Sequence, residues 1–189
     1  MVLVLALLVG LVFGAGDQYL GSLVNSGSWT AAASLLSAPW LVLPFAFGCT
    51  QTRVGRAMVV GLLATLSALA GYFVMLASPL EGAQLSLHAL GAWLTSSGWV
   101  VVGGGLVTGP VFGFLAQRWR TRRAWLSAVL VAGALCLEPL AERIAGNTWS
   151  STVSLLEVAA GIVLASYFFV TGTTFRRRDR PSARGVHAR

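Results

Sequence analysis

Charged residues are scarce in this 189-residue chain, at 10% of the sequence, and lysine is absent altogether. Hydrophobic residues make up 56% of the chain, and the mean hydropathy is +0.78. A water-soluble domain of this size carries more charge on its surface, so the composition argues against that class. The apolar residues also occur in long runs that approach the roughly 20 residues needed to cross a bilayer as a helix. The composition therefore predicts a helical membrane protein.

Several chemical motifs are also missing. Cys49 and Cys136 are the only cysteines, and no CxxC pair or nucleotide-binding loop occurs. Neither His88 nor His187 stands in a pattern that supports catalysis or metal binding. The basic residues lie beside apolar segments rather than in a nucleic-acid-binding motif. We therefore expect no enzyme activity, no cofactor, no metal site and no nucleic-acid partner.

Six apolar segments divide the chain. They predict an all-α, polytopic membrane protein with a six-transmembrane-helix bundle over residues 1–175, followed by an Arg-rich disordered cytoplasmic tail over 176–189. Residues 83–95 have helical spacing and predict either an interfacial helix or an extension at the start of the fourth span. The six predicted helices cover about 1–24, 29–50, 57–77, 97–117, 124–145 and 152–175.

The two signs of charge are predicted to lie at opposite ends of the bundle. The loops after the second and fourth helices and the tail after the sixth contain every arginine except Arg143. The positive-inside rule places these loops in the cytoplasm, with both chain termini there too, and anionic membrane lipids are the expected counter-charge. Every acidic residue except Asp179 falls in the opposite, outer half.

A candidate ligand site follows from these acids. Glu138 and Glu142 are four residues apart and share one face of the fifth helix, whereas Asp17 and Glu157 come from the first and sixth helices. A carboxylate at membrane depth is costly unless it faces the protein interior, a partner or a ligand. With Trp40 and Tyr19 nearby, these acids predict an outward-facing acidic and aromatic pocket for a small cationic or amphipathic molecule.

Less specific interpretations remain open for the same residues. Glu142 and Glu157 could pair with Arg143, and Asp17 could cap a helix end among the lipid headgroups. Trp40 lies beside a proline in mid-span, where ordinary core packing explains it as well as a ligand does.

Small residues recur at helical spacing in three of the predicted helices. Gly105, Gly109 and Gly113 form a stripe in the fourth helix, and such stripes let two helix backbones approach closely. The alternative function is therefore a structural membrane subunit that packs against a partner subunit through this stripe. Shorter sets of small residues occur in the first and third helices at Gly10, Gly14, Ala64, Ala68 and Gly71.

Three short motifs resemble an uncharacterised actinobacterial membrane family, domain of unknown function 6518. The resemblance implies a bacterial protein of the cytoplasmic (inner) membrane, and it brings no established activity. The motifs are Ser37-Ala38-Pro39-Trp40 with Pro44-Phe45-Ala46-Phe47-Gly48, then Gly109-Pro110-Val111-Phe112-Gly113, and Glu138-Pro139-Leu140-Ala141.

The predicted architecture also resembles the substrate-binding subunits of energy-coupling-factor vitamin transporters. Those proteins have six helices, cytoplasmic termini and a ligand site in the outer half. The resemblance implies a transporter subunit that depends on another subunit or an ion gradient for energy.

Overall fold

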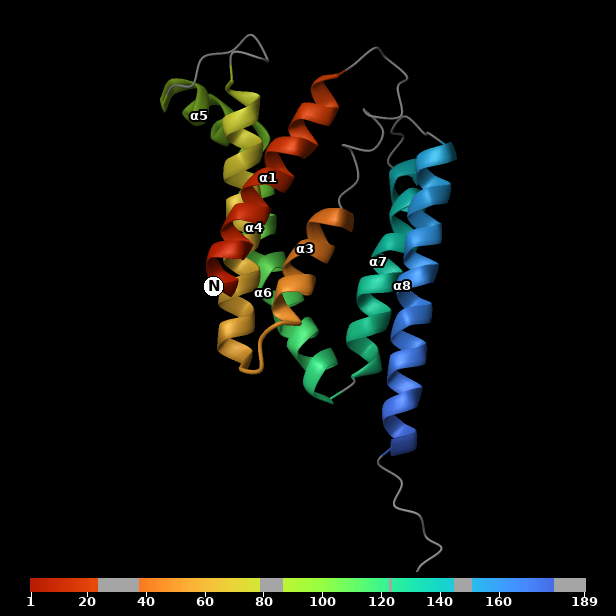
Figure 1. The fold of residues 1–189 in the computed structure, drawn as a ribbon. Helices are drawn as coiled ribbons and strands as arrows, with labels where there is room; N and C mark the ends of the chain where they lie inside the picture. Colours follow the sequence, from red (N-terminus) through yellow and green to blue (C-terminus); the bar gives the residue numbers. More distant parts are fainter. Residues whose placement is uncertain (24–37, 79–86, 123, 145–150, 179–189) are drawn as a thin grey trace, which may run out of the picture.

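The computed structural model describes residues 1–23, 38–78, 87–122, 124–144 and 151–178, which form helices and short turns without any strand (Figure 1). The all-helical prediction is confirmed for this part of the chain. Residues 29–37 of the second predicted helix and 179–189 of the predicted tail lie outside it. The helices are α1 (Val2–Ser22), α3 (Ala38–Gly48), α4 (Val54–Leu76), α5 (Leu87–Trp93), the π-helical turn η2 (Leu94–Gly98), α6 (Trp99–Arg122), α7 (Trp125–Ile144) and α8 (Ser151–Arg178).

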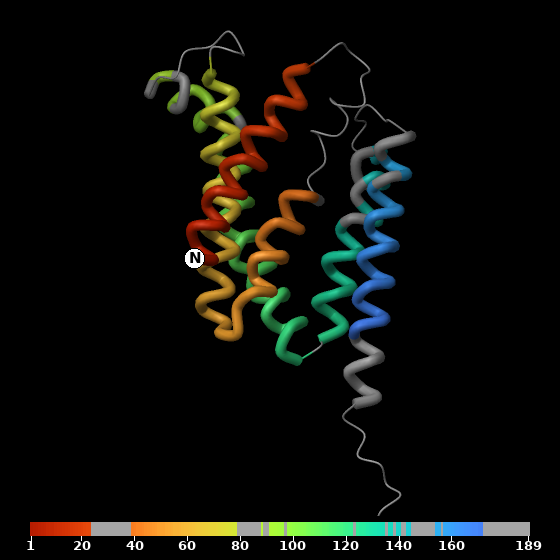
Figure 2. Tube along the Cα trace, viewed as in Figure 1, coloured from red at the N-terminus to blue at the C-terminus, as the bar shows by residue number. Residues whose placement is uncertain are grey.

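Successive long helices run in alternating directions (Figure 2). α1, α4 and α7 run upward in this view, and α3, α6 and α8 run downward. The turn between α3 and α4 and the connection between α6 and α7 therefore lie at the same, lower end.

Among the residues that the structure describes, three helices are long and apolar enough to cross a membrane: α1, α4 and α6. At ~1.5 Å per residue, each reaches roughly 30 Å or more, the thickness of the hydrocarbon layer. The other apolar helical stretches among the described residues are shorter, and they are Pro39–Gly48 in α3, Trp125–Ala134 in α7 and Glu157–Thr171 in α8.

The helix ends differ from the predicted ones at the arginine-rich sites. α4 begins at Val54 rather than at 57, and α8 continues to Arg178 rather than ending at 175. α6 continues to Arg122, through most of a segment predicted to be a loop after residue 117. Arginine favours helix almost as much as alanine does, so a run of positive charge does not end a helix. The arginines therefore indicate where the apolar part of a helix ends, and the helical backbone can continue beyond that point.

α4 packs against α1 on one side and against α6 on another (Figure 1). Gly10 and Gly14 of α1 are buried where α1 crosses α4. A methyl group added at Gly10 would lie 2.5 Å from the carbonyl oxygen of Ala64, and one at Gly14 would overlap the carbonyl oxygen of Ala68. The two backbones are therefore in direct contact, and no side chain larger than hydrogen fits between them.

The glycine stripe of α6 lies against α4 in the same manner. Gly105, Gly109 and Gly113 are all buried, and a methyl group at Gly109 would lie 2.9 Å from the Cα atom of Leu62. Gly48, at the end of α3, meets α6 at Gly113, where an added methyl group would lie 2.7 Å from the carbonyl oxygen. α4, α6 and α3 therefore pack at backbone distance around Gly113.

α7 and α8 form a hairpin that joins the other helices through a cluster of aromatic and small side chains. The ring of Trp119 on α6 lies 4.7 Å from that of Phe168 on α8, and Phe45 on α3 lies 5.7 Å from Phe168. We call this set the aromatic cluster, and its buried members are Phe45, Ala116, Trp119, Ala128, Val131 and Phe168.

The outward surface of the helices is apolar. On α1, the side chains of Val4, Leu8 and Val12 are 59%, 57% and 69% exposed, and they lie one turn apart on one face. On α6, Val100 and Val107 are similarly exposed. A continuous apolar exterior of this kind is suited to contact with lipid chains and is rare on water-soluble proteins.

Candidate functional site

The structure brings two of the predicted site residues together. The indole N–H of Trp40, on α3, donates a hydrogen bond to a carboxylate oxygen of Asp17, on α1, with the two atoms 3.2 Å apart. Both side chains are partly buried. Asp17 lies five residues before the end of α1, so its carboxylate joins two helices and does not cap the end of its own.

Two further aromatic rings pack against Trp40. Phe13 lies one helical turn before Asp17 on α1, and its ring centroid is 5.4 Å from that of Trp40 in an edge-to-face arrangement. The ring of Tyr72, on α4, also meets Trp40 edge to face, with the two centroids 6.1 Å apart. Three helices thus contribute to one cluster of a carboxylate and three rings, which we call the Asp17 cluster: Phe13, Asp17, Trp40 and Tyr72.

Trp40 occupies the first turns of α3, one residue after Pro39 and four before Pro44. Pro44 is fully buried inside this helix and has no N–H group to donate. The carbonyl group of Trp40 therefore lacks the donor that an uninterrupted helix would supply. The Asp17 cluster is built beside an interrupted stretch of backbone, which membrane proteins tolerate where protein or a cavity surrounds it.

Tyr19 lies apart from this cluster. Residues two apart on a helix point to nearly opposite sides, so Tyr19 and Asp17 do not share a face of α1. The Tyr19 side chain is 45% exposed. Helix geometry therefore separates two residues that the sequence interpretation had placed in one pocket.

Glu157 belongs to a different part of the bundle. It lies on α8, its side chain is 5% exposed, and its carboxylate is therefore inside the protein rather than against lipid. Within the described residues, α1 packs on α4 and, to a small extent, on α3, whereas α8 packs on α7. The structure thus places Asp17 and Glu157 in separate helix groups.

The side chains of Glu138 and Glu142 lie outside the described part of the structure. Their backbone belongs to the second half of α7. The prediction that Glu138 anchors a ligand therefore stays a prediction. Among the described residues, no group of three or more His, Cys, Asp or Glu side chains could hold a metal ion.

The glycine stripe of α6 packs against another helix of the same chain. Because α4 covers Gly105, Gly109 and Gly113, this surface is not open to a second protein in the present arrangement. A partner subunit would have to contact a different face.

No family model, curated protein or solved structure matches this chain. The two resemblances drawn from short motifs and from architecture therefore stay predictions.

Two members of this cluster were missed in the sequence. Phe13 could have been found, because it lies four residues before Asp17 and therefore on the same face of the helix. Tyr72 offered no comparable pattern, since its contact with Trp40 depends on how α4 packs against α1 and α3.

Proposed function

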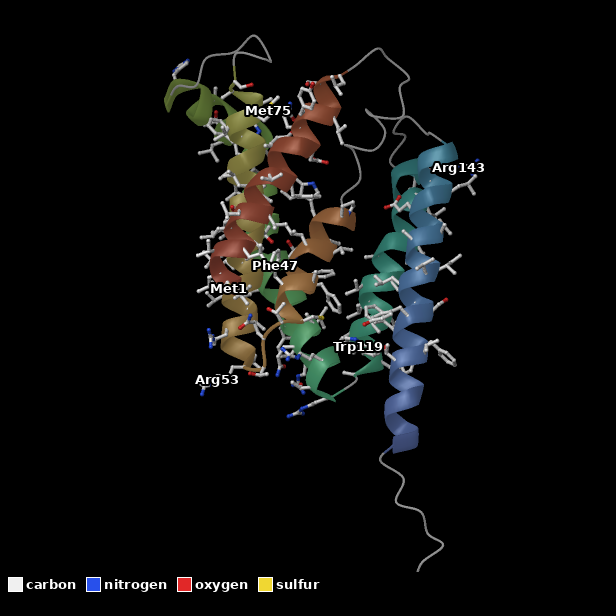
Figure 3. All side chains as sticks on the ribbon, in the orientation of Figure 1. Met1, Phe47, Arg53, Met75, Trp119 and Arg143 are labelled. Carbon is white, nitrogen blue, oxygen red and sulfur yellow. The ribbon has the colours of Figure 1, made fainter. Side chains whose placement is uncertain are left out.

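We propose that this protein is an integral membrane protein that binds a small cationic or amphipathic molecule in the outer half of the bilayer. In this proposal the six predicted helices all cross the membrane and both termini are cytoplasmic. The apolar helices and the opposite placement of arginines and acids support this orientation. Figure 3 agrees with it in placing Arg53 at the lower end of the bundle, away from the end where α1 finishes.

The observation that carries the proposal is the hydrogen bond between Asp17 and Trp40. An indole N–H is a neutral donor, so it orients the carboxylate without balancing its charge. Among the described residues, no basic side chain pairs with Asp17. The negative charge of a carboxylate in an apolar helix is costly without a compensating contact, and a cationic ligand would supply one.

The rings of the cluster favour an organic cation over a bare metal ion. Phe13, Trp40 and Tyr72 offer aromatic faces and edges but no oxygen-rich ligand set. Aromatic faces attract a delocalised or alkylated cation and also receive its apolar groups. The ligand class is therefore an amphipathic ammonium or related cation, bound by Asp17 and packed against Trp40. The sequence has no nucleotide-binding motif, so active transport of this ligand would take its energy from another subunit or from an ion gradient.

We expect Asp17→Asn to weaken the binding of the lipophilic cation tetraphenylphosphonium by about tenfold or more, because the charge partner is lost and the side-chain shape is kept. Equilibrium dialysis with the purified, detergent-solubilised protein measures this affinity. Trp40→Phe removes the N–H group but keeps an aromatic ring, and it should weaken binding less than Asp17→Asn does.

Tyr19→Phe is the matched control, because Tyr19 lies on the other side of α1 and should not affect the affinity. The neutral compound triphenylphosphine oxide controls for apolar partitioning and should bind wild type and Asp17→Asn equally. Equal affinity of wild type and Asp17→Asn for the cation would remove Asp17 from the site and refute the proposal.

A further inference from the structure

Five arginine side chains gather where α4 begins and α6 ends. Figure 3 shows Arg53 at this lower end. Arg53 and Arg56 are exposed, as are Arg120 and Arg122, whereas Arg118 is partly buried with its guanidinium 5.1 Å from the centre of the Phe114 ring. We call this set the arginine surface: Arg53, Arg56, Arg118, Arg120 and Arg122.

Contacts between α6 and the start of α4 hold the arginines of the two helices side by side. The side-chain amide of Gln117, on α6, donates a hydrogen bond of 2.9 Å to the carbonyl oxygen of Thr52, directly before Arg53. Gln117 is 6% exposed, so this contact is protected from solvent. One turn earlier, Gly113 meets the backbone of Ala57. The arginines of α4 and α6 are therefore carried on elements whose separation is set by packing and not by flexible loops.

Within the part of the chain that the structure describes, no acid near the arginine surface balances its charge. The acidic residues of the described chain lie on α1, α7 and α8, toward the opposite end from Arg53. The first turn of α4 has no side-chain cap, so its free N–H groups add to the positive potential. An anionic partner would be attracted here, with the strongest contacts from guanidinium groups that can bind a phosphate through two hydrogen bonds.

We propose that the arginine surface binds the phosphate headgroup of an anionic phospholipid. Position favours a lipid over an acidic protein. α4 and α6 are both long and apolar enough to cross a membrane, so arginines at their ends lie at the level of the headgroups. The lipid chains would then lie along the exposed apolar faces of these same helices. This inference uses the membrane orientation of the proposed function but does not depend on a ligand at Asp17.

Native mass spectrometry of the full-length protein in a mild detergent tests the proposal. Dioleoyl phosphatidylglycerol is the anionic probe, and dioleoyl phosphatidylcholine is the zwitterionic reference. R53Q/R120Q/R122Q should weaken phosphatidylglycerol binding about tenfold, with no change for phosphatidylcholine. R53K/R120K/R122K should fall between this variant and wild type, because lysine keeps the charge but not the paired hydrogen bonds.

A matched control removes the same charge from the tail, as R180Q/R184Q/R189Q. It should bind phosphatidylglycerol as wild type does, and so should Asp17→Asn. An equal loss in the tail variant would show that net charge alone attracts the lipid, and it would overturn the proposal. Unchanged lipid binding in R53Q/R120Q/R122Q would overturn it too, and loss of a co-purifying acidic protein from that variant would assign the surface to a protein partner instead.

Discussion

Gly14→Ala is expected to lower the free energy of unfolding by about 3 kcal/mol, near the upper end of what overpacking usually costs. A methyl group at this position would overlap the carbonyl oxygen of Ala68 and lie 2.9 Å from the backbone nitrogen of Tyr72. Neither atom can rotate away, because both belong to the backbone of α4. The substitution must therefore push α1 away from α4 over several turns. Unfolding in detergent micelles, followed by circular dichroism, measures the loss.

Gly16→Ala is the control for this prediction, since it makes the same change in the same helix. A methyl group at Gly16 would point into open space, with no atom of another helix within 4 Å. Alanine favours helix by about 1 kcal/mol over glycine, so this variant should be as stable as wild type or slightly more stable. If both variants lost stability equally, the close crossing of α1 and α4 would be incorrect.

Trp119→Ala is expected to cost about 3–5 kcal/mol, the usual loss when a buried tryptophan is truncated. Trp119 is 3% exposed, and its ring centroid lies 4.7 Å from that of Phe168, on α8, and 6.0 Å from that of Trp125, the first residue of α7. It lies in the aromatic cluster that joins the α7–α8 hairpin to the other helices. Loss of this ring should therefore loosen the hairpin first.

Hydrogen exchange can detect where the structure opens. In Trp119→Ala, backbone amides of α7 and α8 should exchange faster, while those of α1 and α4 keep their protection. Trp99→Ala is the control, because Trp99 is on the same helix but 65% exposed. Faster exchange spread evenly over all helices would contradict a separate attachment of the hairpin.

Much of the fold could be predicted, because long apolar runs indicate helices that are surrounded by lipid. The small residues of α1, α4 and α6 were also visible as stripes. Their partners were not, since a stripe shows that close approach is allowed and not which helix approaches. From the sequence, Gly109 could equally have packed against another protein. The structure shows that it packs against Leu62 of α4.

The candidate site was harder to predict for a related reason. The positions of the acids in the sequence predicted their depth in the membrane. Residues on different helices can share one depth without being neighbours, so depth did not show which side chains meet. Asp17 and Trp40 are far apart in the sequence, and their contact depends on how α3 is placed beside α1. Tyr19 was close in sequence to Asp17 but not on the same helix face, which helix geometry alone could have shown.

The glycine crossing between α1 and α4 has a consequence for synthesis. Gly14 and Ala68 are separated by about fifty residues, so α1 is complete several seconds before its partner helix at ribosomal rates of roughly 5–20 residues per second. During that interval the glycine face of the nascent chain is uncovered. Only when α4 emerges can the chain cover this face with its own backbone.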